Sequence, residues 1–200
     1  MKKPLLLVFC KNPEIGKVKT RLAARIGPEK ALAIYQLLLK KTAATLSELE
    51  IDIHLYYTGD PIKNDVFELP KVTKKKQNGG DLGERMYHAF TDGFTTHSPV
   101  LIIGTDLWSL EALDIQYAIN ALLEKEAVIG PSKDGGYYLL GLNKVIPSLF
   151  QNKNWGGNSV LSDTCQDIPE TQLQLLVEKN DIDTLEDLKE HSTLYQLIHE

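Results

Sequence analysis

The feature that most constrains the fold is the alternation of short apolar runs with longer amphipathic segments. The apolar runs have strand length, and the segments between them carry apolar residues at helical spacing. The predicted strands are residues 5–10, 52–59, 99–106, 127–131, 136–142 and 172–180. The predicted helices are residues 28–50, 82–97, 111–126 and 184–200, the last capped by Thr184 with Asp187 three residues on.

This alternation predicts an α/β fold with mostly parallel strands joined by right-handed crossovers. The alternation weakens after residue 127, which predicts an antiparallel addition at one side of the sheet. The polar stretch at residues 71–81 is interpreted as a loop, because no second self-sufficient core follows it. We therefore expect a single domain spanning residues 1–200.

Charge and composition exclude several classes of protein. The net charge of −5 argues against nucleic-acid binding, which needs a basic face. The two cysteines, Cys10 and Cys165, lie far apart and have no metal-ligand spacing. The apolar run at residues 5–10 is too short for a signal peptide, and no other run approaches the ~18 residues of a membrane span. We expect a cytoplasmic protein without a membrane span.

The segment after the first predicted strand, "CKNPEIGKVKTRL", is basic although the chain is acidic. Its cations could converge on a phosphate or pyrophosphate, its glycine allows a tight backbone path, and its threonine could add a hydroxyl or cap the following helix. The residues concerned are Lys11, Gly16, Lys17, Lys19, Thr20 and Arg21. The alternative is a solvated loop with scattered lysines; a Walker A loop is excluded because the Gly-Lys-Ser/Thr ending is missing.

Acidic residues follow two other predicted strands. Asp106 ends the most hydrophobic strand and could hold a divalent ion such as Mg²⁺, or could merely cap the next helix. Asp181 and Asp183 follow the last strand, and they could be further metal ligands or carboxylates favoured at a helix N-terminus.

Two glycine-rich stretches complete the set. Asp134-Gly135-Gly136 is a turn signal between two strands, which a hairpin alone would explain, although glycines also let a backbone approach a ligand. The stretch "QNGGDLGERM" places Gln77, Asp81 and Arg85 beside glycines at a helix start, where a ligand site or a simple helix cap is expected. Ligands of open α/β sheets bind outside the carboxyl ends of the strands, where the basic segment, the Asp106 stretch and the Asp134-Gly135-Gly136 turn fall.

Taken together, five motifs resemble a bacterial family of GT-A-like proteins usually classed as glycosyltransferases. Some of its members are associated with arsenosugar biosynthesis, and it is similar to molybdopterin and phospholactate nucleotidyltransferases. The resemblance runs from about Leu5 to Leu188, through "FCKNPEIGKVKTRLA", "QNGGDLGERMYHAF", "IIGTDLWSL", "IGPSKDGGYYLLGL" and "DIDTLEDL". It implies a nucleotide-diphospho-sugar transferase fold, a three-layer Rossmann-like sandwich with a mixed sheet.

The resemblance also implies roles for the residues named above. The basic loop would hold nucleotide and phosphate, and Asp106 would hold Mg²⁺ or Mn²⁺ with Asp183 as second ligand. The acceptor side would be lined by Asp134, Gly135, Gly136, Tyr137 and Trp108. Two departures fall on this side: Leu107-Trp108 stands where the family usually has a proline, and Gly156-Gly157 where it tends to have Ser-Thr.

The expected function is a metal-dependent transferase that uses a nucleotide-sugar donor and a small-molecule acceptor, which Asp134 could deprotonate. One alternative is nucleotidyl transfer from an NTP, although the single Gly16 in the loop favours glycosyl transfer over it. The other alternative is a nucleotide-binding protein without catalysis that binds a partner protein.

Overall fold

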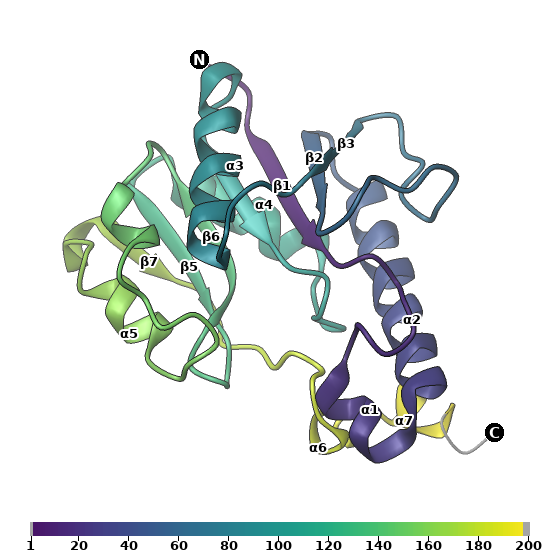
Figure 1. The fold of residues 1–200 in the computed structure, drawn as a ribbon. Coiled ribbons are helices and arrows are strands. Elements are labelled where there is room, and N and C mark those ends of the chain that lie inside the picture. Colours follow the sequence, from purple (N-terminus) through teal and green to yellow (C-terminus); the bar gives the residue numbers. More distant parts are fainter. Residues whose placement is uncertain (1, 198–200) are drawn as a thin grey trace.

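The computed structural model describes residues 2–197, and within them strands and helices alternate as the sequence predicts (Figure 1). The strands are β1 (Leu5–Cys10), β2 (Asp52–Tyr57), β3 (Val72–Lys76), β4 (Val100–Ile103), β5 (Ala127–Pro131), β6 (Tyr137–Leu142) and β7 (Leu173–Leu175). The α-helices are α1 (Thr20–Ile26), α2 (Pro28–Ser47), α3 (Leu82–Thr96), α4 (Ala112–Ala121), α5 (Val160–Cys165), α6 (Leu185–Lys189) and α7 (Ser192–Gln196). Two short 3-10 helices, η1 (Pro147–Phe150) and η2 (Glu170–Gln172), complete the elements.

The strands form one mixed sheet in the order β3-β2-β1-β4-β6-β5-β7. All neighbouring pairs are parallel except those of β6, which runs antiparallel to both β4 and β5. The α/β class and the mixed sheet are therefore confirmed.

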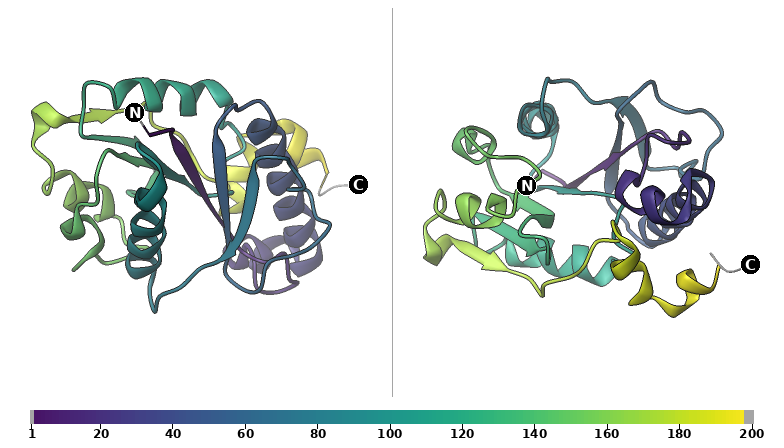
Figure 2. Two further views of the ribbon diagram at one scale, coloured as in Figure 1. Left: turned by 90° about the horizontal axis from the view of Figure 1, so that it is seen from above. Right: turned by 60° about the horizontal axis from the view of Figure 1, so that its bottom comes forward.

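Strand β1 shows why both faces of the sheet are covered. Its residues alternate in direction, as in any strand, and both sets are apolar. Leu6 and Val8 pack in one core cluster with α2 and α4, whereas Leu5 and Leu7 pack in a second cluster with α3 and η1. Helices α3 and α4 accordingly lie on opposite sides of the strands (Figure 2).

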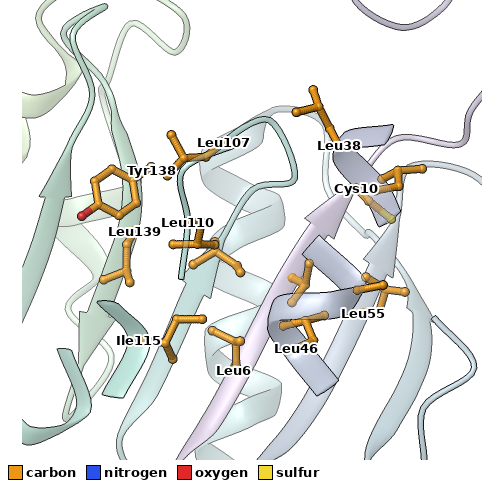
Figure 3. Close-up of a cluster of buried hydrophobic side chains, with 14 of the residues drawn as sticks. Leu6, Cys10, Leu38, Leu46, Leu55, Leu107, Leu110, Ile115, Tyr138 and Leu139 are labelled. Carbon is orange, nitrogen blue, oxygen red and sulfur yellow. The ribbon is translucent and has the colours of Figure 1, made fainter. Parts of the chain in front are cut away.

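The first of these clusters extends to the edge where the loops carry polar residues. Figure 3 shows Leu6 and Cys10 of β1 beside Leu38 and Leu46 of α2. Cys10 is 3% exposed at the end of β1, so the loop that follows leaves the sheet directly from a packed position.

The chain end returns to the same edge. The Ile182 backbone N–H donates a hydrogen bond to the Asp106 carbonyl at 3.0 Å. Helix α6 follows, begins with the predicted reciprocal cap between Thr184 and Asp187, and lies beside α1 (Figure 1). This return brings the last predicted carboxylates next to the first loop.

Several sequence expectations need correction. Residues 72–76 form strand β3, not a loop, because they pair in parallel with β2 at the sheet edge. The antiparallel strand β6 lies inside the sheet and not at one side. The predicted helix at 111–126 ends at Ala121, and the closing helix is split into α6 and α7, with residues 198–200 outside the described part.

None of the helices in the described part of the chain is both long enough and apolar enough to cross a bilayer.

Candidate active site

Two adjoining cavities lie at the carboxyl edge of the sheet. The first, of about 190 Å³, is lined by Lys11, Val18, Lys19, Thr20, Arg21, Tyr35, Asp106 and Asp183. The second, of about 270 Å³, is lined by Arg21, Ser132, Lys133, Asp134, Asn180, Asp181, Asp183, Thr184, Asp187 and Glu190. Arg21 and Asp183 border both, so the structure brings together residues from the loop after β1, the loop after β4, the β5–β6 turn and the segment after β7.

Lys19 is the centre of the first cavity. Its side chain is 3% exposed, and its Nζ lies 2.5 Å from Asp106 Oδ1 and 2.9 Å from Asp183 Oδ1. Burial disfavours the charged amine, but the two carboxylates outweigh burial and raise the pKa of Lys19 above its usual value. Lys19 therefore stays protonated at neutral pH.

The backbone of Lys19 is also unusual. It has φ 48° and ψ 45°, in the left-handed region, and it forms the N-cap of α1. Residues other than glycine adopt this conformation infrequently, and such strain is often found at functional sites. Thr20 is the first residue of α1 and makes no side-chain cap, so the expectation that it caps this helix was wrong.

Arg21 completes the cation set of the first cavity. Its guanidinium forms a short ion pair with Asp183 Oδ2, and its side chain is 64% exposed. Burial acts to raise the pKa of Asp183, but Lys19 and Arg21 outweigh burial and hold that pKa below its usual range. Asp183 thus remains a carboxylate held between two cations.

Tyr35 is a site residue that the sequence reasoning missed. Its hydroxyl accepts a hydrogen bond from the Lys11 N–H at 2.9 Å and donates one to the Lys11 carbonyl at 3.0 Å. It also lies 3.3 Å from the Thr105 hydroxyl. Tyr35 therefore links the loop after β1 to the loop after β4. In the sequence it lies on the apolar face of the predicted helix, a position that indicates a core residue and not a site residue.

Two carboxylates of the second cavity have few partners. Asp134 Oδ1 accepts the Gly136 N–H at 2.9 Å, and Asp181 Oδ2 accepts the Ser132 hydroxyl at 3.2 Å. Burial, and then the neighbouring Asp106 and Asp134, raise the pKa of Asp181 to about 7. The cavity thus places a proton-exchanging carboxyl near neutral pH beside an exposed carboxylate.

Other residues of the predicted phosphate loop lie elsewhere. Lys17 is 72% exposed and pairs with Glu14 at 2.6 Å, and neither Lys17 nor Gly16 lines either cavity. The solvated-loop alternative therefore fits this part of the loop, while Lys11, Lys19, Thr20 and Arg21 converge as predicted.

The polar side chains in and beside the glycine-rich stretch before α3 form hydrogen bonds with backbone groups. Asp81 caps α3 by accepting the Glu84 N–H, which confirms the helix cap as the role of this residue. The Gln77 side-chain amide donates hydrogen bonds to the carbonyls of Cys10, at the end of β1, and Tyr56, in β2. The Arg85 guanidinium donates one to the Gly79 carbonyl. None of Gln77, Asp81 and Arg85 lines either of the two cavities.

The alternative reading of Asp106 as a helix cap was wrong. Helix α4 begins at Ala112, and Glu111 forms its reciprocal cap with Asp114. Asp106 instead faces Lys19, with 41% of its side chain exposed. It is available to a ligand in the first cavity.

The predicted acceptor residues separate in space. Asp134 lines the second cavity, but Gly135 packs against Asn158, Tyr137 contacts Met86, and Trp108 packs on the core. Asp134 alone of the predicted set lines either of the two cavities described above, and the turn itself is the expected hairpin between β5 and β6. Ser132, Lys133 and Asn180 line the second cavity without having been predicted, because a lone polar residue in a loop carries no spacing signal.

The carboxylates of the first cavity fit a divalent cation in part. Asp106 and Asp183 direct one oxygen each to a single cationic centre, Lys19 Nζ, and oxygen is the ligand that Mg²⁺ and Mn²⁺ prefer. Among residues 2–197, no group of three or more His, Cys, Asp or Glu is placed to hold a metal ion. Two carboxylates suffice where substrate phosphates and water complete the shell.

A comparison with protein-family models identifies the family of this chain. Residues 41–157 match the model of DUF2064, described as an uncharacterized protein conserved in bacteria. The chain belongs to this family. Among curated proteins, none matches the chain.

A solved structure resembles the chain over its full length. It comes from Desulfovibrio desulfuricans G20, is provisionally named a nucleotide-diphospho-sugar transferase, and is 32% identical with a TM-score of 0.86. The match covers 100% of this chain and 95% of that chain. The predicted nucleotide-diphospho-sugar transferase fold is confirmed.

More distant structures share the fold with this DUF2064 member. The 4-diphosphocytidyl-2C-methyl-D-erythritol synthase of Anaerococcus prevotii DSM 20548 is 13% identical with a TM-score of 0.62, over 100% of this chain and 97% of that one. Rv0371c of Mycobacterium tuberculosis H37Rv, in complex with manganese, is 12% identical with a TM-score of 0.56, over 98% of each chain.

Proposed function

We propose that this protein is a metal-dependent transferase that passes a sugar from a nucleotide-sugar donor to a small-molecule acceptor. The observation that carries the proposal is the first cavity, where three cations of the N-terminal loop meet Asp106 and Asp183. The name of the relative from Desulfovibrio desulfuricans supports the same class of donor.

The donor's phosphates would bind in the first cavity. Lys11 and Arg21 are exposed there, and Thr20 supplies a hydroxyl and a backbone N–H at the start of α1. A diphosphate would meet cations on the loop side of the cavity, where its negative charge is neutralised. The remaining cation, Lys19, lies deepest and contacts both carboxylates.

Asp106 and Asp183 would hold Mg²⁺ or Mn²⁺, as their shared orientation allows. Such an ion would supply positive charge that offsets the negative charge on the departing group. The manganese bound to Rv0371c, a protein of the same fold, supports the choice of ion.

The acceptor would bind in the second cavity, next to the donor across Arg21 and Asp183. Asp134 would take the proton from the acceptor hydroxyl, because its carboxylate is exposed and only one of its oxygens accepts the Gly136 N–H hydrogen bond. The acceptor oxygen then bonds to the sugar carbon, the sugar–phosphate bond breaks, and the nucleoside diphosphate leaves.

Nucleotidyl transfer is the second candidate, because cytidylyltransferases are among the proteins that share this fold. In that reaction the acceptor oxygen bonds to the α-phosphorus of an NTP, and pyrophosphate leaves. The same cations and carboxylates would serve it.

The leaving group separates the two reactions. We would incubate the protein with Mn²⁺ and each of a panel of nucleotide-sugars or NTPs, adding pooled hydroxylated small molecules as acceptors, and identify products by mass spectrometry. A nucleoside diphosphate from one nucleotide-sugar is expected, and its loss in Asp106→Asn is required. Pyrophosphate from an NTP would favour nucleotidyl transfer. Absence of turnover, with nucleotide binding retained, would favour a non-catalytic nucleotide-binding protein.

A further inference from the structure

Lys19 stands where the proposed metal would bind. Its Nζ is within 2.9 Å of both Asp183 Oδ1 and Asp106 Oδ1, and its side chain is 3% exposed. The space between the two carboxylates is therefore already taken by a cation. Arg21 differs, because it contacts Asp183 alone and lies largely in solvent.

Lys19 and a divalent ion exclude one another from this position. Mg²⁺ binds carboxylate oxygens at about 2.0–2.1 Å, so an ion shared by Asp106 and Asp183 would lie inside the contact distance of the ammonium. Both species are also positive, and their repulsion is weakly screened at a buried site.

Within the first cavity, Lys19 gains a further anionic partner only when an anion binds. The other groups there are the cationic Lys11 and Arg21 and the hydroxyls of Thr20 and Tyr35. A phosphate bound among them would be the new acceptor for the Lys19 ammonium. Rotation of this one side chain would exchange its carboxylate partners for phosphate oxygens.

We propose that Lys19 blocks the metal position in the free protein and that a bound phosphate opens it by drawing the ammonium away. Metal and nucleotide then bind with positive coupling, and Lys19 is the residue that couples them. This inference rests on the proposed function, because it takes Asp106 and Asp183 as metal ligands. The coupling is reciprocal: the metal strengthens phosphate binding by the same factor.

The first test measures Mn²⁺ binding alone, by the electron paramagnetic resonance signal of free Mn²⁺. Lys19→Met is expected to bind Mn²⁺ at least tenfold more tightly than the unaltered protein, because the blocking charge is gone. Lys19→Arg keeps the charge and is expected to bind Mn²⁺ as weakly as the unaltered protein. Lys17→Met is the matched control, since Lys17 lies outside both cavities, and it should change nothing.

The second test adds sulfate as a phosphate-like dianion. Sulfate is expected to tighten Mn²⁺ binding by at least threefold more in the unaltered protein than in Lys19→Met, where only direct ligation of Mn²⁺ by the anion remains. Circular dichroism checks that each variant is folded. If Lys19→Met does not fold, Lys19→Gln replaces it, because the amide still donates a hydrogen bond to one carboxylate.

The outcomes distinguish this inference from the proposed function. Equal Mn²⁺ affinity in the unaltered protein and Lys19→Met, both lost in Asp106→Asn, would overturn the block by Lys19 and leave the metal site standing. No Mn²⁺ binding in any folded variant, with or without sulfate, would overturn both the metal site and the inference.

Discussion

At the scale of single residues, burial and neighbours give chemically identical side chains different tasks. Lys17 and Lys19 are two positions apart, yet one is 72% exposed and the other 3%. Asp183 and Asp181 differ as well, because two cations hold the pKa of Asp183 below its usual range, while burial and two carboxylates raise the pKa of Asp181 to about 7. The sequence identifies such residues as candidates, but their burial and their charged neighbours are known only from the fold.

Asp181 predicts a dependence of stability on pH. Its pKa of about 7 in the folded protein exceeds that of the unfolded chain, usually near 3.9. Between these values the folded state binds more protons, so the free energy of unfolding falls as pH rises from about 4 to 7. Asp181→Asn lacks the titrating carboxyl and should not lose this free energy of unfolding. Its stability relative to the unaltered protein should therefore increase by on the order of 2 kcal/mol between pH 5 and pH 8.

Urea unfolding at several pH values in EDTA measures this difference. The two proteins should diverge as pH rises, with the variant the more stable at pH 8. Parallel curves between pH 5 and 8 would show that Asp181 does not titrate in this range.

The separation of Lys17 from Arg21 predicts unequal effects on nucleotide binding. Arg21→Ala should weaken the best-binding nucleotide at least tenfold, because Arg21 lines both cavities and would contact phosphate. Lys17→Ala should leave the dissociation constant within twofold. Isothermal titration calorimetry measures both, and equal losses in the two variants would contradict the site assigned here.

At the scale of elements, the loops at one sheet edge owe their positions to packing between distant segments. The β5–β6 turn is an example. Gly135 has φ 87°, its carbonyl accepts the Leu161 N–H at 2.9 Å, and a Cβ there would overlap the Asn158 carbonyl. The Asn158–Leu161 segment therefore fixes the turn that carries Asp134.

This contact can be measured against a matched glycine. Gly156 has nearly the same φ, 86°, but a Cβ there meets no atom within 4 Å. Gly156→Ala should cost only backbone strain, about 1 kcal/mol, and Gly135→Ala about 2–4 kcal/mol because the overlap adds to it. Chemical unfolding gives both values. Similar losses in the free energy of unfolding for the two variants would mean that Asn158 does not pack closely against the turn.

Much of the arrangement of elements is predictable from the sequence. Strong apolar runs gave β1, β4, β5 and β6, and the spacing in α2 and α3 gave their extents closely. Strand β3 was missed because "VTKKK" is an edge strand with polar side chains, and its pairing with β2 is a tertiary effect. The place of β6 between β4 and β5 likewise depends on long-range pairing that no local pattern encodes.

The candidate site was predictable only in part, for the same reason. Residues in the loops that follow strands, such as Asp106 after β4 and Lys19 after β1, converge because parallel strands end at one edge. Tyr35 could not be recognised, because a tyrosine on the buried face of a helix looks like core. Conversely, Trp108 was expected at a ligand and instead packs on the core.

At the scale of the whole molecule, the first and last parts of the chain build one site together. Lys19 and Arg21 follow β1, Asp183 precedes α6, and their ion pairs join segments more than 160 residues apart. The fold shared with a 32% identical relative provides this meeting point. Ligands bound there should therefore stabilise the entire fold and not a single loop.

The nucleotide and metal site is tested by a thermal-shift screen of the unaltered protein and Asp106→Asn against UDP-, GDP- and dTDP-sugars and NTPs, with and without Mn²⁺. A ligand at one hundred times its dissociation constant stabilises the folded state by about 2.7 kcal/mol, which is a readily measured shift. We predict a shift with one nucleotide-sugar that requires Mn²⁺ and disappears in Asp106→Asn. A shift of the same size without Mn²⁺, retained in Asp106→Asn, or no shift with any nucleotide, would contradict the account.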